Sequence, residues 1–441
     1  MIDASTRVLE WWRPAMAPTA TATPSRRPHA ATDEGYGRAS FRGLLAFLAV
    51  LMLSPQTVFP FLQPLRLAFL SAGFAVLAYL MQRLASREPL IESTPAVKYV
   101  ALIVAWAVLT VPMSYWPGGS VAFLLDLYFK TVVVFLLLAH VVDSERRLRS
   151  IAWAMTLFAI PLAFTGVSNY LGGDFAGGNG RILGYQAPLT TNPNDLALTL
   201  NLILPLAIGL FLDSGRVLVK CVLLVAISLS VAGVIVTFSR SGFLTLAVVM
   251  AIYGWKLVWR GRTSLVAVVL VLGIGAAPFV PGHYWHRLAT ITDIEEDRSG
   301  SAQERWSDAV VAAQYAATHP LVGAGVGQGA LAMNEERGAR WLNVHNVYLQ
   351  YAVELGVPGL VLFLLLFRAS LRSALLAQRI AAYARASALF HLSEAVRVSL
   401  LAFVVAAMFH PAAYQFWFYL LAGLALAAQS ITTRTLLEPA A

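Results

Sequence analysis

Cysteine and charged residues are scarce in this chain. Its single cysteine, Cys221, lies within an apolar run, so an intrachain disulfide is excluded and the redox compartment cannot be inferred from cysteine content. Only 12% of the 441 residues are charged, whereas 58% are hydrophobic. No secretory signal is evident: Ser25-Arg26-Arg27 faintly resembles a twin-arginine signal, but the first apolar run is long enough to remain in the membrane. The composition is that of a helical membrane protein that crosses the bilayer several times.

Long apolar runs, in contrast, are abundant. A helix needs about 20 residues to cross roughly 30 Å of hydrocarbon, and about twelve segments meet this requirement. The predicted spans lie near residues 42–60, 64–83, 98–116, 121–142, 150–170, 193–212, 217–237, 241–259, 263–281, 344–367, 394–410 and 412–431. We therefore predict an all-α polytopic membrane protein with about twelve transmembrane helices.

The formal charge of +9 is explained by orientation in the membrane, because cytoplasmic loops concentrate Lys and Arg. With a cytoplasmic N-terminus, every inner segment is basic. The inner residues are Arg26, Arg27, Arg38, Arg42, Arg83, Arg87, Lys98, Arg146, Arg147, Arg149, Arg216, Lys220, Lys256, Arg260, Arg262, Arg368, Arg372, Arg379, Arg385 and Arg397. The short outer connections carry only Arg66, Arg181 and Arg240 as exceptions. Both termini are expected in the cytoplasm, and the lipid bilayer rather than nucleic acid accounts for the basic balance.

Four segments follow from this topology. Residues 1–40, rich in Ala, Pro, Thr and Arg, are expected to form a disordered cytoplasmic tail. Residues 41–281 carry spans one to nine, and residues 282–343 form one large periplasmic loop. The helical spacing of apolar residues between Gln303 and Thr318 predicts a helical cap there. Residues 344–441 carry the last three spans, with a cytoplasmic interfacial helix over residues 371–392.

A first polar cluster lies on the outer side. Its glycine-rich loop ends at Arg181 and permits backbone amides to approach a ligand closely. Asn192 is a good helix N-cap and Pro193 a good first helical residue, so the helix that follows points its positive end at the outer water. An anion is favoured there. Alternatively, Asn192 to Asp195 only cap a helix and Arg181 is a solvated charge.

Two further clusters share the outer side. The segment Thr237 to Gly242 separates two spans with almost no loop, so Arg240 lies at membrane depth or at its outer edge, where a charge is costly unless used or paired. A snorkelling arginine that anchors a hairpin is the alternative. His345-Asn346 stands where the chain re-enters the membrane. A lone histidine is more often structural, but the arginines on the same face favour a catalytic role.

Other candidates have simpler explanations. Arg305 is either a substrate contact or an exposed helix charge. Asp126 and Lys130, four residues apart within a span, are best explained as a mutually neutralising pair. Glu354 is too far along the helix to share a face with His345.

Two patterns mimic ligand sites. The acidic residues near residue 295 and two nearby histidines match no metal-ligand spacing, so no metal is predicted. These residues are His283, His286, Asp293, Glu295, Glu296 and Asp297. The alternate glycines at positions 323, 325, 327 and 329 follow no strand, and a flexible loop is the better interpretation than a nucleotide site.

The three clusters resemble motifs of bacterial O-antigen ligases. Arg240 followed by three residues and Leu244 fits one motif, and His345-Asn346 followed by nine residues, Gly356, two residues and Gly359 fits the histidine motif. Three other stretches are similar to the broader O-antigen ligase and polymerase superfamily. They are residues 181–184, 192–197 and 318–325. The resemblance extends over roughly residues 150 to 370.

This resemblance implies a metal-independent, inverting glycosyltransferase of the bacterial inner membrane without a cofactor. It would move a glycan from undecaprenyl diphosphate to an acceptor hydroxyl, a lipid A-core sugar in a ligase, at the periplasmic face. His345 would be the general base, and Arg181 and Arg240 would hold the diphosphate. The further substrate contacts predicted are Asn192, Asn194, Arg305 and Asn346. A sugar diphosphate needs only charge neutralisation and removal of one hydroxyl proton, which these residue types supply.

Alternative functions stay open. An O-antigen polymerase, or a relative that glycosylates protein hydroxyls, would use the same donor and differ only in its acceptor. A flippase for lipid-linked oligosaccharides, which is not an enzyme, would also need many spans and arginines near a diphosphate. It should carry charge along a path through the membrane, whereas Arg181, Arg240 and His345 gather on one face and only Asp126 and Lys130 lie deeper. The distribution favours an enzyme.

Overall fold

The computed structural model describes residues 31–176, 181–259, 261, 263–264, 301–338, 341 and 343–437. Within this part of the chain, ten helices are long and apolar enough to cross a membrane, and the helix Pro95–Leu109 is a shorter apolar one. The prediction of an all-α polytopic membrane protein is confirmed. The predicted ninth span, residues 263–281, lies outside the described residues except for positions 263 and 264.

The described residues up to position 213 form six long helices, with α5, η3 and α6 counted as one. Its elements are α1 (Ala31–Leu53), α2 (Pro55–Val58), η1 (Pro60–Leu65), α3 (Leu67–Ser86), α4 (Pro95–Leu109), η2 (Val111–Met113), α5 (Pro117–Phe123), η3 (Leu124–Tyr128), α6 (Phe129–Val141), α7 (Glu145–Gly172) and α8 (Pro193–Asp213). Here α5, η3 and α6 run on as one span over Pro117–Val141. Between α7 and α8, two short strands, β1 (Phe175–Ala176) and β2 (Arg181–Ile182), pair antiparallel.

The second half continues the bundle and adds a cap. Its elements are α9 (Val217–Val236), α10 (Arg240–Trp259), α13 (Ser301–Thr318), α14 (Gly329–Arg337), α15 (Val347–Tyr383), α16 (Ser387–Ala406), α17 (Phe416–Thr432) and η5 (Thr433–Leu437). The helix expected over Gln303 to Thr318 is present as α13. Helix starts follow capping rules: Thr94 and Ser144 each accept a hydrogen bond from the third residue that follows, as N-caps do.

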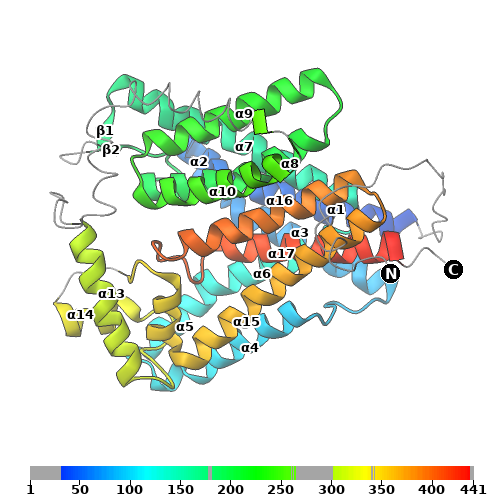
Figure 1. Cartoon of the computed structure of the whole chain (residues 1–441). Coiled ribbons are helices and arrows are strands. Elements are labelled where there is room, and N and C mark those ends of the chain that lie inside the picture. Colours follow the sequence, from blue (N-terminus) through cyan, green and yellow to red (C-terminus); the bar gives the residue numbers. More distant parts are fainter. Residues whose placement is uncertain are drawn as a thin grey trace, which may run out of the picture.

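The helices are arranged around a central pair. Figure 1 shows α7 to α10 on one side of α16 and α17, and α4, α5 and α15 on the other. The hairpin strands, α13 and α14 lie together at one end of the bundle, which we name the cap end. The start of α1 and the end of α17 lie at the opposite end. In the centre, the buried hydroxyl of Tyr419 contacts those of Tyr128 at 2.8 Å and Tyr351 at 3.1 Å, so these polar groups are paired inside the apolar core.

Residues 31–40 differ from the prediction of a disordered tail that extends to residue 40. They form the first turns of α1, and the Ser40 hydroxyl donates to the carbonyl of Ala75 on α3 at 3.0 Å. A Cβ on Gly43 would lie 3.0 Å from the Ala75 backbone, so α1 and α3 pack closely. Tertiary packing therefore stabilises a helix that composition alone does not predict.

The interfacial helix expected over residues 371–392 is also not a separate element. Residues 371–383 continue α15, and residues 387–392 begin α16. Side chains at helical spacing, including Ser370, Ala374, Ala377 and Ala381, are buried because this part of α15 packs against the protein. Similarly, the third predicted span ends early, at Leu109, since Pro112 lies in the short η2 turn that follows α4.

The loop between α13 and α14, residues 319–328, is fixed rather than flexible, and we call it the glycine loop. The backbone amides of Ala324 and Gly325 donate to the carbonyls of Val353 and Glu354 on α15 at 2.7 and 2.9 Å. The amide of Gly327 donates to the Glu354 carboxylate at 2.7 Å. The prediction of flexibility was wrong because these partners lie about 30 residues later in the chain.

Candidate active site

Arg181 on β2 brings the first two sequence clusters together. Its Nε and Nη2 donate to the carbonyl oxygen of Thr237 at 3.1 and 3.0 Å, and Nη2 also donates to Oδ1 of Asn194 at 2.8 Å. Thr237 is the residue after α9 and lies three positions before Arg240. The planar guanidinium can make these contacts simultaneously because its donors form a rigid fork.

Helix α8 supplies the second half of this network. The side chain of Asn192 accepts from the amide of Asn194 at 2.8 Å, and Pro193 is the first helical residue, as predicted. Oδ1 of Asn194 accepts a second hydrogen bond, from the Ser239 hydroxyl at 2.8 Å. One amide oxygen is thus shared by β2 and the α9–α10 turn, which fixes the positive end of α8 against both.

Arg240 opens α10 directly after this turn. Phe238 has a left-handed backbone (φ 51°), which reverses the chain between two long helices without a loop. Asn201, buried within α8, donates to the carbonyl of Gly242 at 2.9 Å and so ties the first turn of α10 to α8. Arg240 is half-buried, at the hairpin end where the sequence predicted it.

His345 and Asn346 precede α15 and are both half-buried. The side chain of Asn346 caps α15 by accepting from the amide of Leu349 at 3.0 Å. The next residue, Val347, donates its amide to the carbonyl of Ala407 at 2.8 Å. This contact attaches the histidine motif to the segment between α16 and α17, residues 407–415.

The same segment contacts the arginine network through His410. Nδ1 of His410 lies 2.9 Å from the carbonyl of Ala406, and Nε2 lies 3.3 Å from the carbonyl of Asn194. Burial lowers the pKa of His410, and the charge of Arg305 on α13 lowers it further, whereas the hydrogen bond to Ala406 and the charge of Asp195 act in the opposite direction. Arg305, predicted as a substrate contact, lies near the start of α13 and is half-buried.

The structure thus joins Arg181, Asn192 and Asn194 in one network with the turn that precedes Arg240. Residues 407–415 connect this network to Val347, the residue that follows His345 and Asn346. Within residues 407–415, His410 makes the contact with Asn194, which lies 216 positions earlier in the chain. The sequence interpretation missed His410 and Asn201. A histidine beside a proline at the end of a span, and an asparagine within an apolar run, were the available signals.

Of the two further groups singled out in the sequence, only one lies in the described part of the chain. Lys130 and Asp126 form an ion pair on the outer surface of their span, where the π-helical turn η3 passes into α6. The acidic residues near residue 295 and the two histidines considered as metal ligands all lie outside the described residues.

Comparisons with known proteins find one family match, in the central region of the chain. A family model described as O-antigen ligase matches residues 224–364, which include Arg240, Arg305 and His345. The resemblance seen in the sequence is confirmed over this region. No curated protein matches the chain. A chain from a solved structure, described as "Structural coordination of polymerization and crosslinking by a peptidoglycan synthase complex", is 20% identical with a TM-score of 0.43, over 77% of this chain and 96% of that one.

Proposed function

We propose that this protein transfers a glycan from undecaprenyl diphosphate to a sugar hydroxyl of lipid A-core, a function supported by the match of residues 224–364 to a family model described as O-antigen ligase. The reaction takes place at the periplasmic face of the bacterial inner membrane. It inverts the anomeric carbon and requires no metal ion.

The observation that carries the proposal is the contact of Arg181 with Thr237 and Asn194. It joins a loop arginine, a helix N-terminus and the turn before Arg240 at one place. Two guanidinium groups and the positive end of α8 together suit a diphosphate, which carries several negative charges. An isolated hairpin anchor would need none of these contacts.

The chemistry then divides between two groups. His345 takes the proton of the acceptor hydroxyl as its oxygen attacks the anomeric carbon. The bond from that carbon to the diphosphate oxygen breaks, and the electron pair leaves with the undecaprenyl diphosphate. Arg181 and Arg240 stabilise the charge that develops on this leaving group, so a general acid is not needed.

A transfer assay with purified protein, lipid-linked donor and lipid A-core tests the proposal. We expect His345→Ala to abolish transfer and to leave donor binding largely intact, because the base acts on the acceptor. Arg240→Ala should weaken both donor binding and transfer. His319→Ala changes an exposed histidine of the glycine loop and is the matched control, with activity close to that of the unmodified protein.

Two results would contradict the mechanism. One is transfer that survives His345→Ala. The other is activity that is lost on treatment with a chelator and restored by a divalent ion. Replacing lipid A-core by a second lipid-linked repeat unit or by a protein acceptor in the same assay separates a ligase from a polymerase and from a protein glycosyltransferase.

A further inference from the structure

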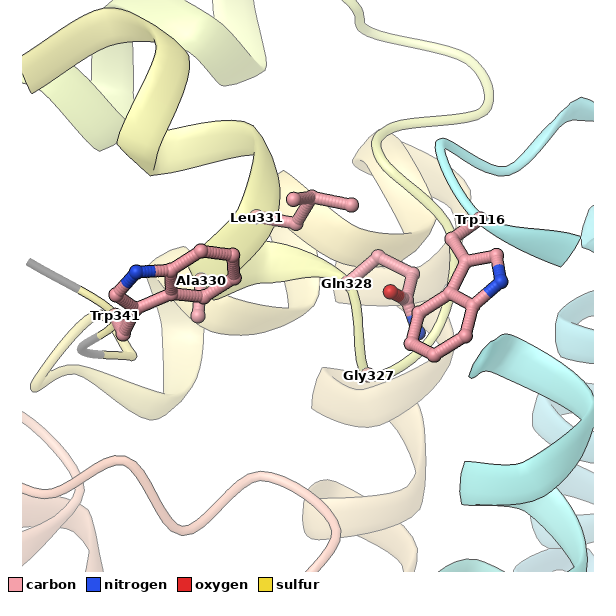
Figure 2. Close-up of a pocket in the computed structure, with 6 residues that line it drawn as sticks. All are labelled: Trp116, Gly327, Gln328, Ala330, Leu331 and Trp341. Carbon is pink, nitrogen blue, oxygen red and sulfur yellow. The ribbon is translucent and has the colours of Figure 1, made fainter. Parts of the chain in front are cut away.

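A pocket at the cap end lies between two exposed indole rings (Figure 2). Trp116 precedes α5 and is 61% exposed, and Trp341 follows α14 and is 68% exposed. The pocket has a volume of about 480 Å³. Its other lining residues are Gly327, Gln328, Ala330 and Leu331. This pocket belongs to none of the three polar clusters.

Trp116 is held in place even though most of its surface is exposed. Its amide donates to the hydroxyl of Ser114 at 3.2 Å, and that hydroxyl contacts the one of Ser120 at 2.8 Å. The ring packs against Gly119, where a Cβ would lie 2.4 Å from ring atom Cε3. A large apolar surface is therefore presented in one orientation, and little conformational entropy is lost when a ligand binds it.

The backbone of Trp341 is also fixed, and its indole ring is exposed. Its backbone is left-handed (φ 52°), which is rare for a bulky residue, and its amide donates to Oδ1 of Asn334 on α14 at 2.9 Å. Burial of the indole does not account for this conformation, because the ring is exposed. Strained backbone of this kind is concentrated at ligand sites.

The lining of the pocket suits a saccharide. The C–H faces of a pyranose ring pack on indole faces, whose electron-rich surface attracts them. Gln328, 6% exposed, adds an amide that can hydrogen-bond hydroxyl groups at the floor of the pocket. Tryptophans that only anchor a protein at the bilayer interface would need neither a concave surface nor a polar group between them.

We propose that the pocket between Trp116 and Trp341 binds a saccharide of the acceptor, an inference that rests on the proposed function. Arg181 contacts α8 and the turn before α10, on one side of α16 and α17. The pocket lies on the other side, where the Gly327 amide and the Glu354 carboxylate tie it to α15, the helix that follows His345.

Binding measurements on the full-length protein in lipid nanodiscs test this inference. The probes are core oligosaccharide released from lipopolysaccharide by mild acid hydrolysis, and the lipid-linked donor. We expect Trp116→Ala and Trp341→Ala each to weaken binding of the core oligosaccharide about tenfold, comparable to the loss of one stacked ring elsewhere. Binding of the donor should not change. In the transfer assay, KM for the acceptor should rise while kcat changes little.

Two further variants serve as controls. Trp306 on α13 is 65% exposed and does not line the pocket, so Trp306→Ala should bind the oligosaccharide normally. Trp116→Phe keeps a smaller ring and should have intermediate affinity, which also guards against a folding defect in Trp116→Ala.

Three outcomes would overturn the inference. These are unchanged oligosaccharide binding in both pocket variants, loss of donor binding instead, and an equal loss in Trp306→Ala. Because oligosaccharide binding is measured without any transfer step, failure of the proposed reaction and failure of the pocket give different results.

Discussion

The side chain of His410 shows how a single residue is controlled by its surroundings. Both ring nitrogens face backbone carbonyls, those of Ala406 and Asn194, but a neutral ring can donate only one proton. Burial lowers the pKa of His410. The ring is therefore neutral at neutral pH, and it donates a hydrogen bond to at most one of the two carbonyls.

The lowered pKa of His410 predicts the direction in which the free energy of unfolding changes with pH. Below the usual histidine pKa of about 6.5, the unfolded chain binds a proton that the folded chain resists, so the free energy of unfolding falls as the pH is lowered. We expect a lower thermal midpoint at pH 5.5 than at pH 7.5, and a smaller difference in His410→Gln. His319→Gln is the control, and an undiminished difference in His410→Gln would contradict the assignment.

Among individual residues, the sequence identified those with local signals. Asn192 and Asn346 cap helices as their positions suggest, and Arg240 lies at a hairpin end because almost no residues separate α9 from α10. Arg181 was identified as a charge on the outer side, but its contact with Thr237 was not. That contact depends on how two segments 56 positions apart pack, which periodicity does not encode.

The glycine loop contains positions whose backbone conformation requires glycine. Gly325 has φ +92°, and a Cβ there would lie 2.3 Å from the side chain of Ser114. Its neighbour Ala324 accepts a hydrogen bond from the amide of Tyr115 at 2.9 Å. Left-handed backbone and close contact together allow only glycine at this position.

Gly325→Ala should therefore destabilise the protein by about 2 kcal/mol or more, since it combines backbone strain with overlap of buried atoms. Thermal unfolding measures this effect. The control is Gly215→Ala between α8 and α9, where a Cβ meets nothing within 4 Å, and its stability should change by less than about 0.5 kcal/mol. Equal midpoints for the two variants would show that the loop is not held as described.

The glycine spacing in the sequence predicted a flexible loop, and the structure shows an ordered one. The order of the loop comes from α15, where the buried Glu354 accepts the Gly327 amide. A buried acid on an apolar helix is itself a signal that a partner is present.

At the scale of the whole molecule, a buried ion pair and a hydrogen bond to its carboxylate join helices α10, α15 and α16. This contact is separate from the proposed site. Lys256 on α10 forms an ion pair with Glu394 on α16, and Gln378 on α15 donates to the same carboxylate at 3.0 Å. Glu394 is 1% exposed. The two sides of the bundle thus meet at α16 through a polar contact as well as through apolar packing.

Removal of one member of a buried ion pair costs about 3–5 kcal/mol, because the other charge stays in a poorly solvated place. Glu394→Ala should lower the thermal midpoint accordingly, and Glu394→Gln should lower it less, since it retains a hydrogen-bonding group. Asp143→Ala removes the more exposed partner of Arg147 and should cost below about 1 kcal/mol. Similar midpoints for Glu394→Ala and Asp143→Ala would contradict this account.

Hydropathy predicted most of the architecture at this scale, because the bilayer requires long apolar helices whatever their neighbours are. It did not predict which helices are central. Helices α8, α16 and α17 are the most buried of the candidate spans in the described part of the chain, yet their sequences are no more apolar than that of α9. Burial by protein and burial by lipid select the same residue types.

The attachment of the glycine loop has a practical consequence for engineering. Backbone hydrogen bonds join this loop to the turn before α5 at Tyr115 and to α15 at Val353 and Val357. Residues 301–338 are thus only part of a structural unit that includes these two membrane helices. A chimera that exchanges the glycine loop between relatives must transplant all three segments together, because a graft of the loop alone would leave its amides and carbonyls facing foreign partners.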